Sequence, residues 1–309
     1  MAPYTSLVTS SMMGKSRHMK EVANYLPSVY ICLREETRGF GYPRRSPSIA
    51  EWLSMGATAA FSEAPIDYHF CLSTLRWSAF IVETIRALAR WIDDPDCKFL
   101  RALDLSPLTK RLEFAWLWNF FAEPPYPGVL TKFWLQVQMA TDTMLQEFPS
   151  GESAYAYFQK KHATYVRNAM KQLRQSFAKY QINDNSLPLL FIFDEARVLC
   201  NYDAYNGARI YEEHGTDFQE SSGDNAEGDQ MPFRNFSNFC AVRRALRYLS
   251  AGTRDVPRIF AIFTETTSRI TNFQPTSWKD PSLRVFLYQE RVSFRQSWSF
   301  PVSTFILGF

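Results

Sequence analysis

The segment that most constrains the fold is an apolar run, Leu189–Phe193, that ends in two adjacent carboxylates, Asp194 and Glu195. A short and continuous apolar run of this kind is typical of a strand buried on both faces of a parallel sheet. Ligands of open α/β folds bind beyond the carboxyl ends of such strands. The segment therefore predicts an α/β fold with a site at the sheet edge to which Asp194 and Glu195 are delivered.

A second segment, near the N-terminus, has the pattern of a phosphate-binding loop. The predicted strand Tyr4–Thr9 leads into TSSMMGKS at residues 9–16, which matches G-x-x-x-x-G-K-[ST] at each fixed position except the first, where Thr9 replaces glycine. In such a loop the backbone N–H groups and the N-terminus of the next helix, here expected to continue through Arg17–Tyr25, surround the phosphates. The residues expected to contact the nucleotide are Ser10, Ser11, Met12, Met13, Gly14, Lys15, Ser16 and Arg17.

Together the two segments predict how ATP and Mg²⁺ would be held. Lys15 is expected to reach the β- and γ-phosphates, while the Ser16 hydroxyl and the Asp194 carboxylate hold Mg²⁺. Glu195 is then placed to polarise the attacking water, which makes Glu195 and Lys15 the main catalytic candidates. The alternatives are a surface turn with an exposed lysine and a strand end with two solvated acids. Two motifs in this order are rarer than either motif alone, which favours the nucleotide site.

Polar residues also follow the predicted strand Ile259–Thr264, where the chain reads TETTSR. A hydroxyl at the tip of the strand beside LLFIFDE can sense the γ-phosphate, and Thr264 and Thr267 are the candidates. The alternative, hydroxyls that cap the next turn, is equally consistent with the sequence because Ser and Thr favour caps.

Three arginines, Arg243, Arg244 and Arg247, lie in the helical pattern FCAVRRALRYL. Helical spacing places Arg243 and Arg247 on one face, with Arg244 beside it. A solvated basic face is the expected arrangement. The alternative is an arginine finger that reaches the nucleotide of a neighbouring molecule.

The remaining pattern alternates strands with helices, which indicates an α/β domain of three layers with a mainly parallel sheet. Strands are predicted at Tyr4–Thr9, Val29–Leu33, Leu189–Phe193, Ile259–Thr264 and Thr304–Leu307. Helices are predicted in segments 48–62, 68–92, 108–122, 128–147 and 152–180, and at Phe236–Leu249. The aromatic residues of the middle helices are expected to pack those helices together.

These elements predict a P-loop nucleoside-triphosphatase core formed by residues 1–47 and 181–309. A large helical insertion or lobe, residues 48–180, separates the second strand from the LLFIFDE strand. Residues 212–232 are acidic and rich in Gly and Ser, which predicts a flexible, solvated loop.

Composition narrows the classes of function. The net charge of +3 over 309 residues gives no support for nucleic-acid binding. The five cysteines lack CxxC spacing and only four histidines are present, so reduced, mostly buried thiols in an intracellular protein are expected rather than a zinc site or a disulfide framework. No apolar run reaches the roughly 20 residues that span a bilayer, so no membrane partner is expected. The abrupt start and end suggest one domain of a longer protein, or an incomplete gene model.

The order of several short segments resembles a known family. SSMMGKSR, ICLRE, GFGYP, FIFDEA, AVRRALR and FTETTSRITNFQP look like the P-loop domains of large uncharacterised fungal proteins, which are related to the nucleotide-binding modules of Crinkler-type proteins. Those modules are similar in turn to the AAA+ and signal-transduction ATPases of the additional-strand catalytic-glutamate class. The resemblance implies that Lys15 and Ser16 belong to the Walker A motif, that Asp194 and Glu195 form the Walker B motif, and that Thr267 lies in a sensor-like stretch.

The resemblance, over about residues 4–275, implies ATP binding and Mg²⁺-dependent hydrolysis by a switch or motor module. The family keeps a small residue in the loop where Met12 and Met13 stand. With Thr9, this departure favours the alternative, a catalytically weak nucleotide-binding scaffold or effector that acts through protein partners. The intact pair of acids in LLFIFDE favours hydrolysis. In either case the helical lobe is the candidate surface for a protein partner or for a homo-oligomer.

Overall fold

The computed structural model describes residues 3–8, 14–34, 45–46, 48–54, 66–94, 114–122, 127–147, 152–179, 188–200, 237–250 and 259–265. The chain divides into two units, residues 1–274 and 275–309, and every described residue lies in the first. The predicted strand Thr304–Leu307, the acidic loop 212–232, Thr267 and the loop residues Thr9, Ser10, Ser11, Met12 and Met13 lie outside the described residues.

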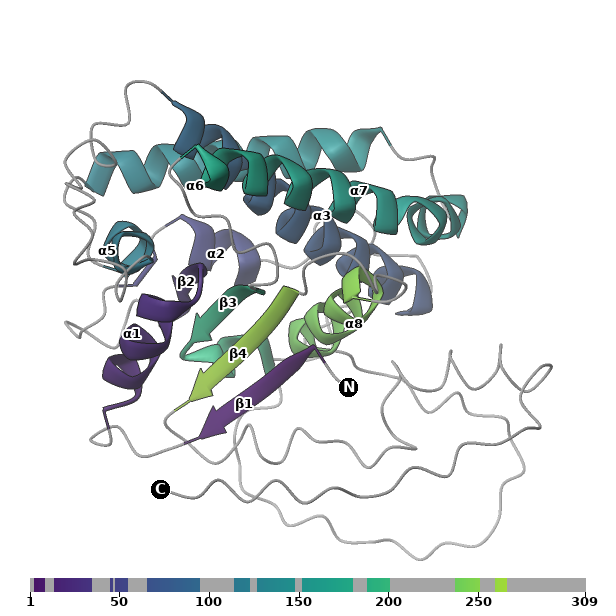
Figure 1. Cartoon of the computed structure of the whole chain (residues 1–309). Helices are drawn as coiled ribbons and strands as arrows, with labels where there is room; N and C mark the ends of the chain where they lie inside the picture. Colours follow the sequence, from purple (N-terminus) through teal and green to yellow (C-terminus); the bar gives the residue numbers. More distant parts are fainter. Residues whose placement is uncertain are drawn as a thin grey trace, which may run out of the picture. The chain divides into compact units, whose positions relative to one another are not determined.

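Four parallel strands form a sheet in the order β1-β4-β3-β2 (Figure 1). The strands are β1 (Tyr4–Val8), β2 (Ser28–Cys32), β3 (Leu189–Asp194) and β4 (Ile259–Glu265). Each boundary falls within one residue of its prediction, and all three strand pairings are parallel, which confirms the predicted α/β class.

The register of the sheet brings polar residues to one level at its carboxyl edge. Cys32 of β2 lies opposite Asp194 of β3, and Leu7 of β1 lies opposite Thr264 of β4. Phe193 of β3 pairs with Phe263 of β4, so the next residues of these two strands, Asp194 and Thr264, lie side by side. All residues of β2 and β3 are buried, which for β3 confirms the prediction of a strand covered on both faces.

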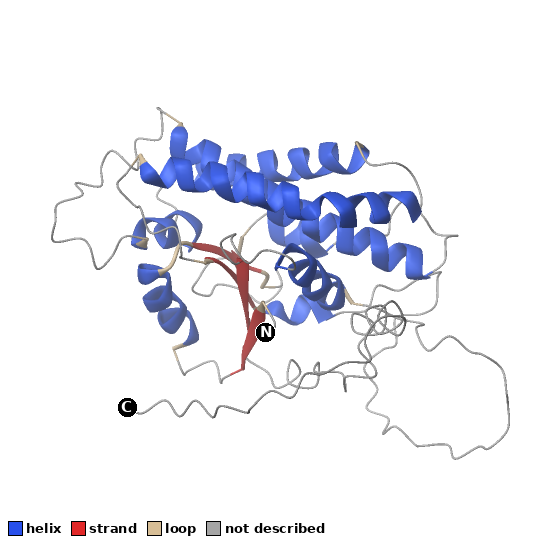
Figure 2. Ribbon diagram, turned by 45° about the vertical axis from the view of Figure 1, so that its right-hand side comes forward, coloured by secondary structure: helices blue, strands red, loops and turns tan. Residues whose placement is uncertain are grey.

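Helices cover both faces of the sheet (Figure 2). The helices are α1 (Lys15–Tyr25), α2 (Ile49–Ser54), α3 (Ile66–Asp93), α5 (Ala115–Ala122), α6 (Pro127–Gln146), α7 (Glu152–Ala178) and α8 (Asn238–Ser250), with a 3₁₀ helix η4 (Ala196–Cys200) after β3. On the α1 and α5 side, the Trp118 ring of α5 lies 4.7 Å from the Tyr30 ring of β2, between centroids. On the α3 and α8 side, Trp77 lies 5.8 Å from Phe193. The sheet therefore forms the middle of three layers.

Helices α6 and α7 pack on α3, so the segment between β2 and β3 adds a further helical layer (Figure 1). A groove of about 1390 Å³ is lined by α3, α6 and α7, with a mixed polar and apolar surface. The Met139 side chain of α6, which lines this groove, is 62% exposed. None of the described helices combines the length and the apolar composition that a membrane crossing needs.

Aromatic residues of the middle helices pack these helices together, as predicted. Trp118 and Trp134 are fully buried, and the Phe121 ring lies 5.5 Å from the Trp134 ring. Four of the five cysteines are described, and none of these four forms a disulfide. Burial raises the pKa of Cys32 to about 12, and the charge of Asp194 adds to the rise, so this thiol stays protonated.

We predict that Trp134→Ala lowers the free energy of unfolding by about 3–5 kcal/mol, because it opens a cavity in this aromatic cluster. The matched control is Leu135→Ala on the same helix, where the side chain is 52% exposed. That variant should change the free energy of unfolding by less than about 0.5 kcal/mol. Urea unfolding followed by tryptophan fluorescence and circular dichroism measures both. Equal losses in the two variants would contradict this description of the core.

Candidate functional site

Helix α1 begins at Lys15, directly after Gly14. Gly14 has φ 67° and ψ 30°, a left-handed conformation that glycine adopts without strain. Its carbonyl accepts a hydrogen bond from the His18 N–H at 2.9 Å, which closes the first helical turn. No side chain of the described residues caps this N-terminus, and no acid lies in its first turn. The free N–H groups of such a helix end favour an anion.

The residues predicted to contact phosphate differ in burial. Lys15 is only 7% exposed, whereas Ser16 is half-buried and Arg17 is exposed. The pKa of the Glu195 carboxyl is raised, and the positive charge of Lys15 offsets part of that rise. Lys15 begins the helix that follows β1, and the carboxyl ends of β1 and β3 lie on the same side of the parallel sheet.

Asp194 is buried and accepts hydrogen bonds from three donors. The Tyr30 hydroxyl donates to Oδ2 at 2.5 Å. The Thr264 hydroxyl and the Glu195 N–H donate to Oδ1, the latter at 3.0 Å. The Leu33 N–H of the neighbouring strand donates to the Asp194 main-chain carbonyl at 2.8 Å. The carboxylate is therefore fixed by β2, β4 and its own backbone.

Glu195 is half-buried and has φ 54°, a left-handed conformation that is uncommon for a residue with a side chain. Burial raises the pKa of its carboxyl, and the negative charges of Glu265 and Asp194 raise it further. The charges of Lys15 and Arg34 oppose this rise in part. The site therefore combines a carboxyl group of raised pKa, Glu195, with two positively charged side chains, Lys15 and Arg34.

Three residues at this edge were not predicted from the sequence, namely Tyr30, Arg34 and Glu265. Glu265 is fully buried at the end of β4, where its Oε2 accepts a hydrogen bond from the Arg197 N–H at 2.8 Å. Arg34 follows β2 by two residues. The sequence held a signal for each of these residues. Tyr30 is a hydroxyl within an apolar strand. Arg34 and Glu265 directly follow predicted strands, which is the signal that identified Asp194.

The predicted sensor residues have different outcomes. Thr264 donates its hydroxyl to the Asp194 carboxylate. The turn that these hydroxyls would cap in the alternative lies outside the described residues. Contact of Thr264 with a γ-phosphate stays a prediction, and Thr267 lies outside the described residues.

The prediction of a solvated basic face on α8 is wrong for two of its three arginines. Arg243 and Arg244 are 7% and 4% exposed. The Arg243 guanidinium lies 4.9 Å from the centre of the Tyr4 ring, and Arg247 donates to the Tyr4 hydroxyl at 3.1 Å. Arg243 and Arg247 thus share one face, as predicted. Aromatic surfaces stack guanidinium groups and so allow them to be buried, which ties these side chains into their own chain.

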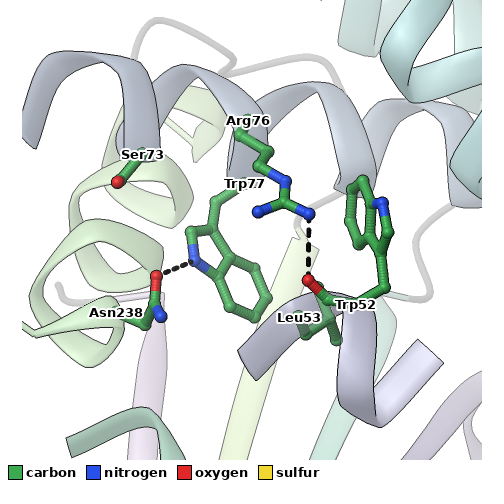
Figure 3. Close-up of a pocket in the computed structure, with 6 residues that line it drawn as sticks. All are labelled: Trp52, Leu53, Ser73, Arg76, Trp77 and Asn238. Atoms are coloured by element: carbon green, nitrogen blue, oxygen red, sulfur yellow. Dashed lines mark hydrogen bonds between the residues drawn. The ribbon is translucent and has the colours of Figure 1, made fainter. Parts of the chain in front are cut away.

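A small cavity of about 10 Å³ lies among α2, α3 and α8 (Figure 3). Trp77 Nε1 donates to Asn238 Oδ1 at 3.4 Å, and Arg76 donates to the Trp52 carbonyl at 2.9 Å. The Arg76 guanidinium also lies 3.9 Å from the centre of the Trp52 ring. A cavity of this size holds about one water molecule, so it is no nucleotide site.

The described residues contain no group of three or more His, Cys, Asp and Glu side chains that would hold a metal by themselves. Mg²⁺ sites in nucleotide-binding proteins need fewer protein ligands, because phosphates and waters supply the rest. Ser16 and Asp194 are ligands of the right type, since hard oxygen donors suit Mg²⁺. The described residues donate three hydrogen bonds to the Asp194 carboxylate, which leaves one of its roughly four acceptor positions, on Oδ2, without a donor among them.

The N-terminal part of the chain is similar to a known protein family. A family model described as "Domain of unknown function (DUF8735)" matches residues 1–60. The matched region includes β1, α1, β2 and α2, and the description names no activity. Neither the curated proteins nor the solved structures contain a match to this chain. The function is therefore argued from the geometry of the site.

We predict that Glu195→Gln increases stability at pH 7. The fold raises the pKa of Glu195 above its ordinary value of 4.5, so the folded state binds this proton more tightly than the unfolded state does. The stability that the protonated group contributes is present below the ordinary pKa and is lost as pH rises through the raised value. The advantage of the glutamine variant should therefore be largest at pH 7 and disappear below pH 4.5.

Urea unfolding of wild type and Glu195→Gln at several pH values checks this expectation. The matched control is Glu51→Gln, which changes an exposed glutamate on α2 and should leave stability nearly unchanged. A glutamine variant that is less stable than wild type at pH 7 would mean that the charge of Glu195 stabilises the fold.

Proposed function

We propose that this chain binds Mg²⁺-ATP at the carboxyl edge of its sheet and hydrolyses it as a switch or motor module. The observation that carries this proposal is the meeting of three features. Lys15 begins the helix that follows β1, the Asp194–Glu195 pair ends β3, and the Lys15 charge acts on the Glu195 carboxyl. A lysine at a helix N-terminus beside such a pair has the composition of a site for a triphosphate and its metal.

The strand order supports the finer proposal of a three-layer P-loop nucleoside-triphosphatase fold. In the order β1-β4-β3-β2, β4 lies between the strand before the phosphate loop and the strand that ends in the two acids. The sequence resembles the additional-strand catalytic-glutamate class, which an adjacent Asp-Glu pair marks, with a catalytic glutamate beside the metal-binding aspartate. Glu195 has that position relative to Asp194, and Thr264 of β4 contacts Asp194 directly.

Each residue then has a role in binding or in proton transfer. Lys15 and the N–H groups of α1 bind the phosphates, and Ser16 and Asp194 would hold the metal. When bound, Mg²⁺ supplies positive charge that neutralises the charge developing on the phosphates.

Glu195 orients a water for attack on the γ-phosphorus and accepts its proton, while the bond from that phosphorus to the departing ADP breaks. The raised pKa of Glu195 brings its basicity closer to neutral pH, which favours this role. Catalysis here rests on position and electrostatics.

We predict that Lys15→Ala weakens Mg²⁺-ATP binding by about 30-fold or more, because truncating one partner of a buried charge pair costs at least about 2 kcal/mol. Isothermal titration calorimetry with Mg²⁺-ATP measures the affinity. The matched control is Lys20→Ala in the same helix, which should bind as wild type does. Equal affinity in Lys15→Ala and wild type would exclude the phosphate role of Lys15, and absence of binding in wild type would exclude the proposal as a whole.

We predict that Glu195→Gln keeps Mg²⁺-ATP binding and lowers the rate of phosphate release by about 100-fold or more, since general-base catalysis contributes about 10²–10⁴. A phosphate-release assay at saturating ATP checks this, with Glu51→Gln as the control that should retain the wild-type rate. Binding without turnover in the wild-type protein would instead favour the alternative, a nucleotide-binding scaffold that acts through protein partners.

A further inference from the structure

Tyr30 has an unusual position for a polar residue. It lies in the middle of β2, is fully buried, and is flanked along the strand by Val29 and Ile31. Its ring packs on Trp118, and its hydroxyl donates to Asp194 Oδ2 at 2.5 Å. A phenylalanine would fill this space equally well without a donor, so packing alone does not account for the hydroxyl.

The Tyr30 hydroxyl is a permanent donor to Asp194. Because a phenol ordinarily has a pKa of about 10, such a hydroxyl keeps its proton and can donate over the physiological range of pH. Its hydrogen bond goes to an ionised acceptor, which is the stronger kind of hydrogen bond.

The hydrogen bonds of Asp194 divide unevenly between its two oxygens. Oδ1 accepts from Thr264 and from the Glu195 N–H, whereas Oδ2 accepts from Tyr30 alone among the described residues. Rotation of the carboxylate would break these bonds in a buried site, where an unmade hydrogen bond is costly. Tyr30 thus fixes the oxygen that still has an acceptor position.

We propose that Tyr30 is a positioning residue for Mg²⁺, and that its hydroxyl holds the Asp194 carboxylate so that the remaining lone pair of Oδ2 faces the metal of the Mg²⁺-nucleotide complex. This inference rests on the proposed function. Groups that hold metal-binding side chains in place affect metal affinity without touching the metal. Tyr30 has this relation to Asp194, and it extends the site onto β2, the strand at the opposite edge of the sheet from β1.

The test measures how the affinity for a fluorescent ATP analogue depends on Mg²⁺, in wild type and in Tyr30→Phe. The variant keeps the ring that packs on Trp118, and its melting temperature is measured alongside. We expect the Mg²⁺ concentration for half-maximal binding to rise by about 10-fold, since the loss of such a positioning partner costs about 10–100-fold in metal affinity or activity. The affinity for the analogue in EDTA should stay as in wild type, because the phosphate contacts are untouched.

Two further variants separate positioning from a merely structural role. Tyr248→Phe removes a hydroxyl that accepts a hydrogen bond from Arg244 on α8, and it should leave the Mg²⁺ dependence unchanged. In an Asp194→Asn background, Tyr30→Phe should cause no additional shift, since its effect passes through that carboxylate.

The outcomes distinguish the two proposals. If wild type binds the analogue in a Mg²⁺-dependent manner and Tyr30→Phe has the same Mg²⁺ dependence, the positioning role is wrong and the proposed function stands. If Tyr30→Phe weakens the affinity for the analogue equally in EDTA and in Mg²⁺, the positioning role is also overturned, because an equal loss reflects general damage to the site. If wild type binds no nucleotide with Mg²⁺ present, both proposals fall.

Discussion

The buried carboxylate of Asp194 is the group on which the rest of the site depends. An ionised acid away from water is tolerated only when its oxygens are hydrogen-bonded. Here the donors come from Tyr30 of β2, Thr264 of β4 and the next backbone N–H. These contacts form only if β3 lies between β2 and β4 in this register. The order of the strands therefore determines the geometry of the site.

The balance of charge at the carboxyl edge explains why a nucleotide would bind there together with a metal. Asp194, Glu195 and Glu265 end two adjacent strands, and their mutual repulsion contributes to the raised pKa of Glu195. Lys15 and Arg34 offset this charge only in part. Under the proposed function, a triphosphate would add more negative charge, and its affinity would depend on a divalent cation that neutralises both sides.

The local elements were predictable from the sequence, and the contacts between them were not. The apolar run before Asp194 is a pattern within one segment, and so is the helix after Gly14. The Tyr30–Asp194 hydrogen bond joins residues that are 164 positions apart, and it follows from strand order, which no local pattern determines. For Arg243 the 3.6-residue period correctly indicated which residue shares its face. The period carried no information on the aromatic rings that cover that face.

The backbone at Glu195 gives two adjacent acids different surroundings. β3 ends at Asp194, and the left-handed conformation of Glu195 turns the chain at once into η4. The Arg197 N–H of η4 bonds to Glu265, which anchors the turn to β4. Residues in such sparsely populated conformations persist only where the surroundings fix them. Asp194 thus keeps its hydrogen bonds to the neighbouring strands, whereas the pKa of Glu195, in the turn after β3, is raised by burial and by its acidic neighbours.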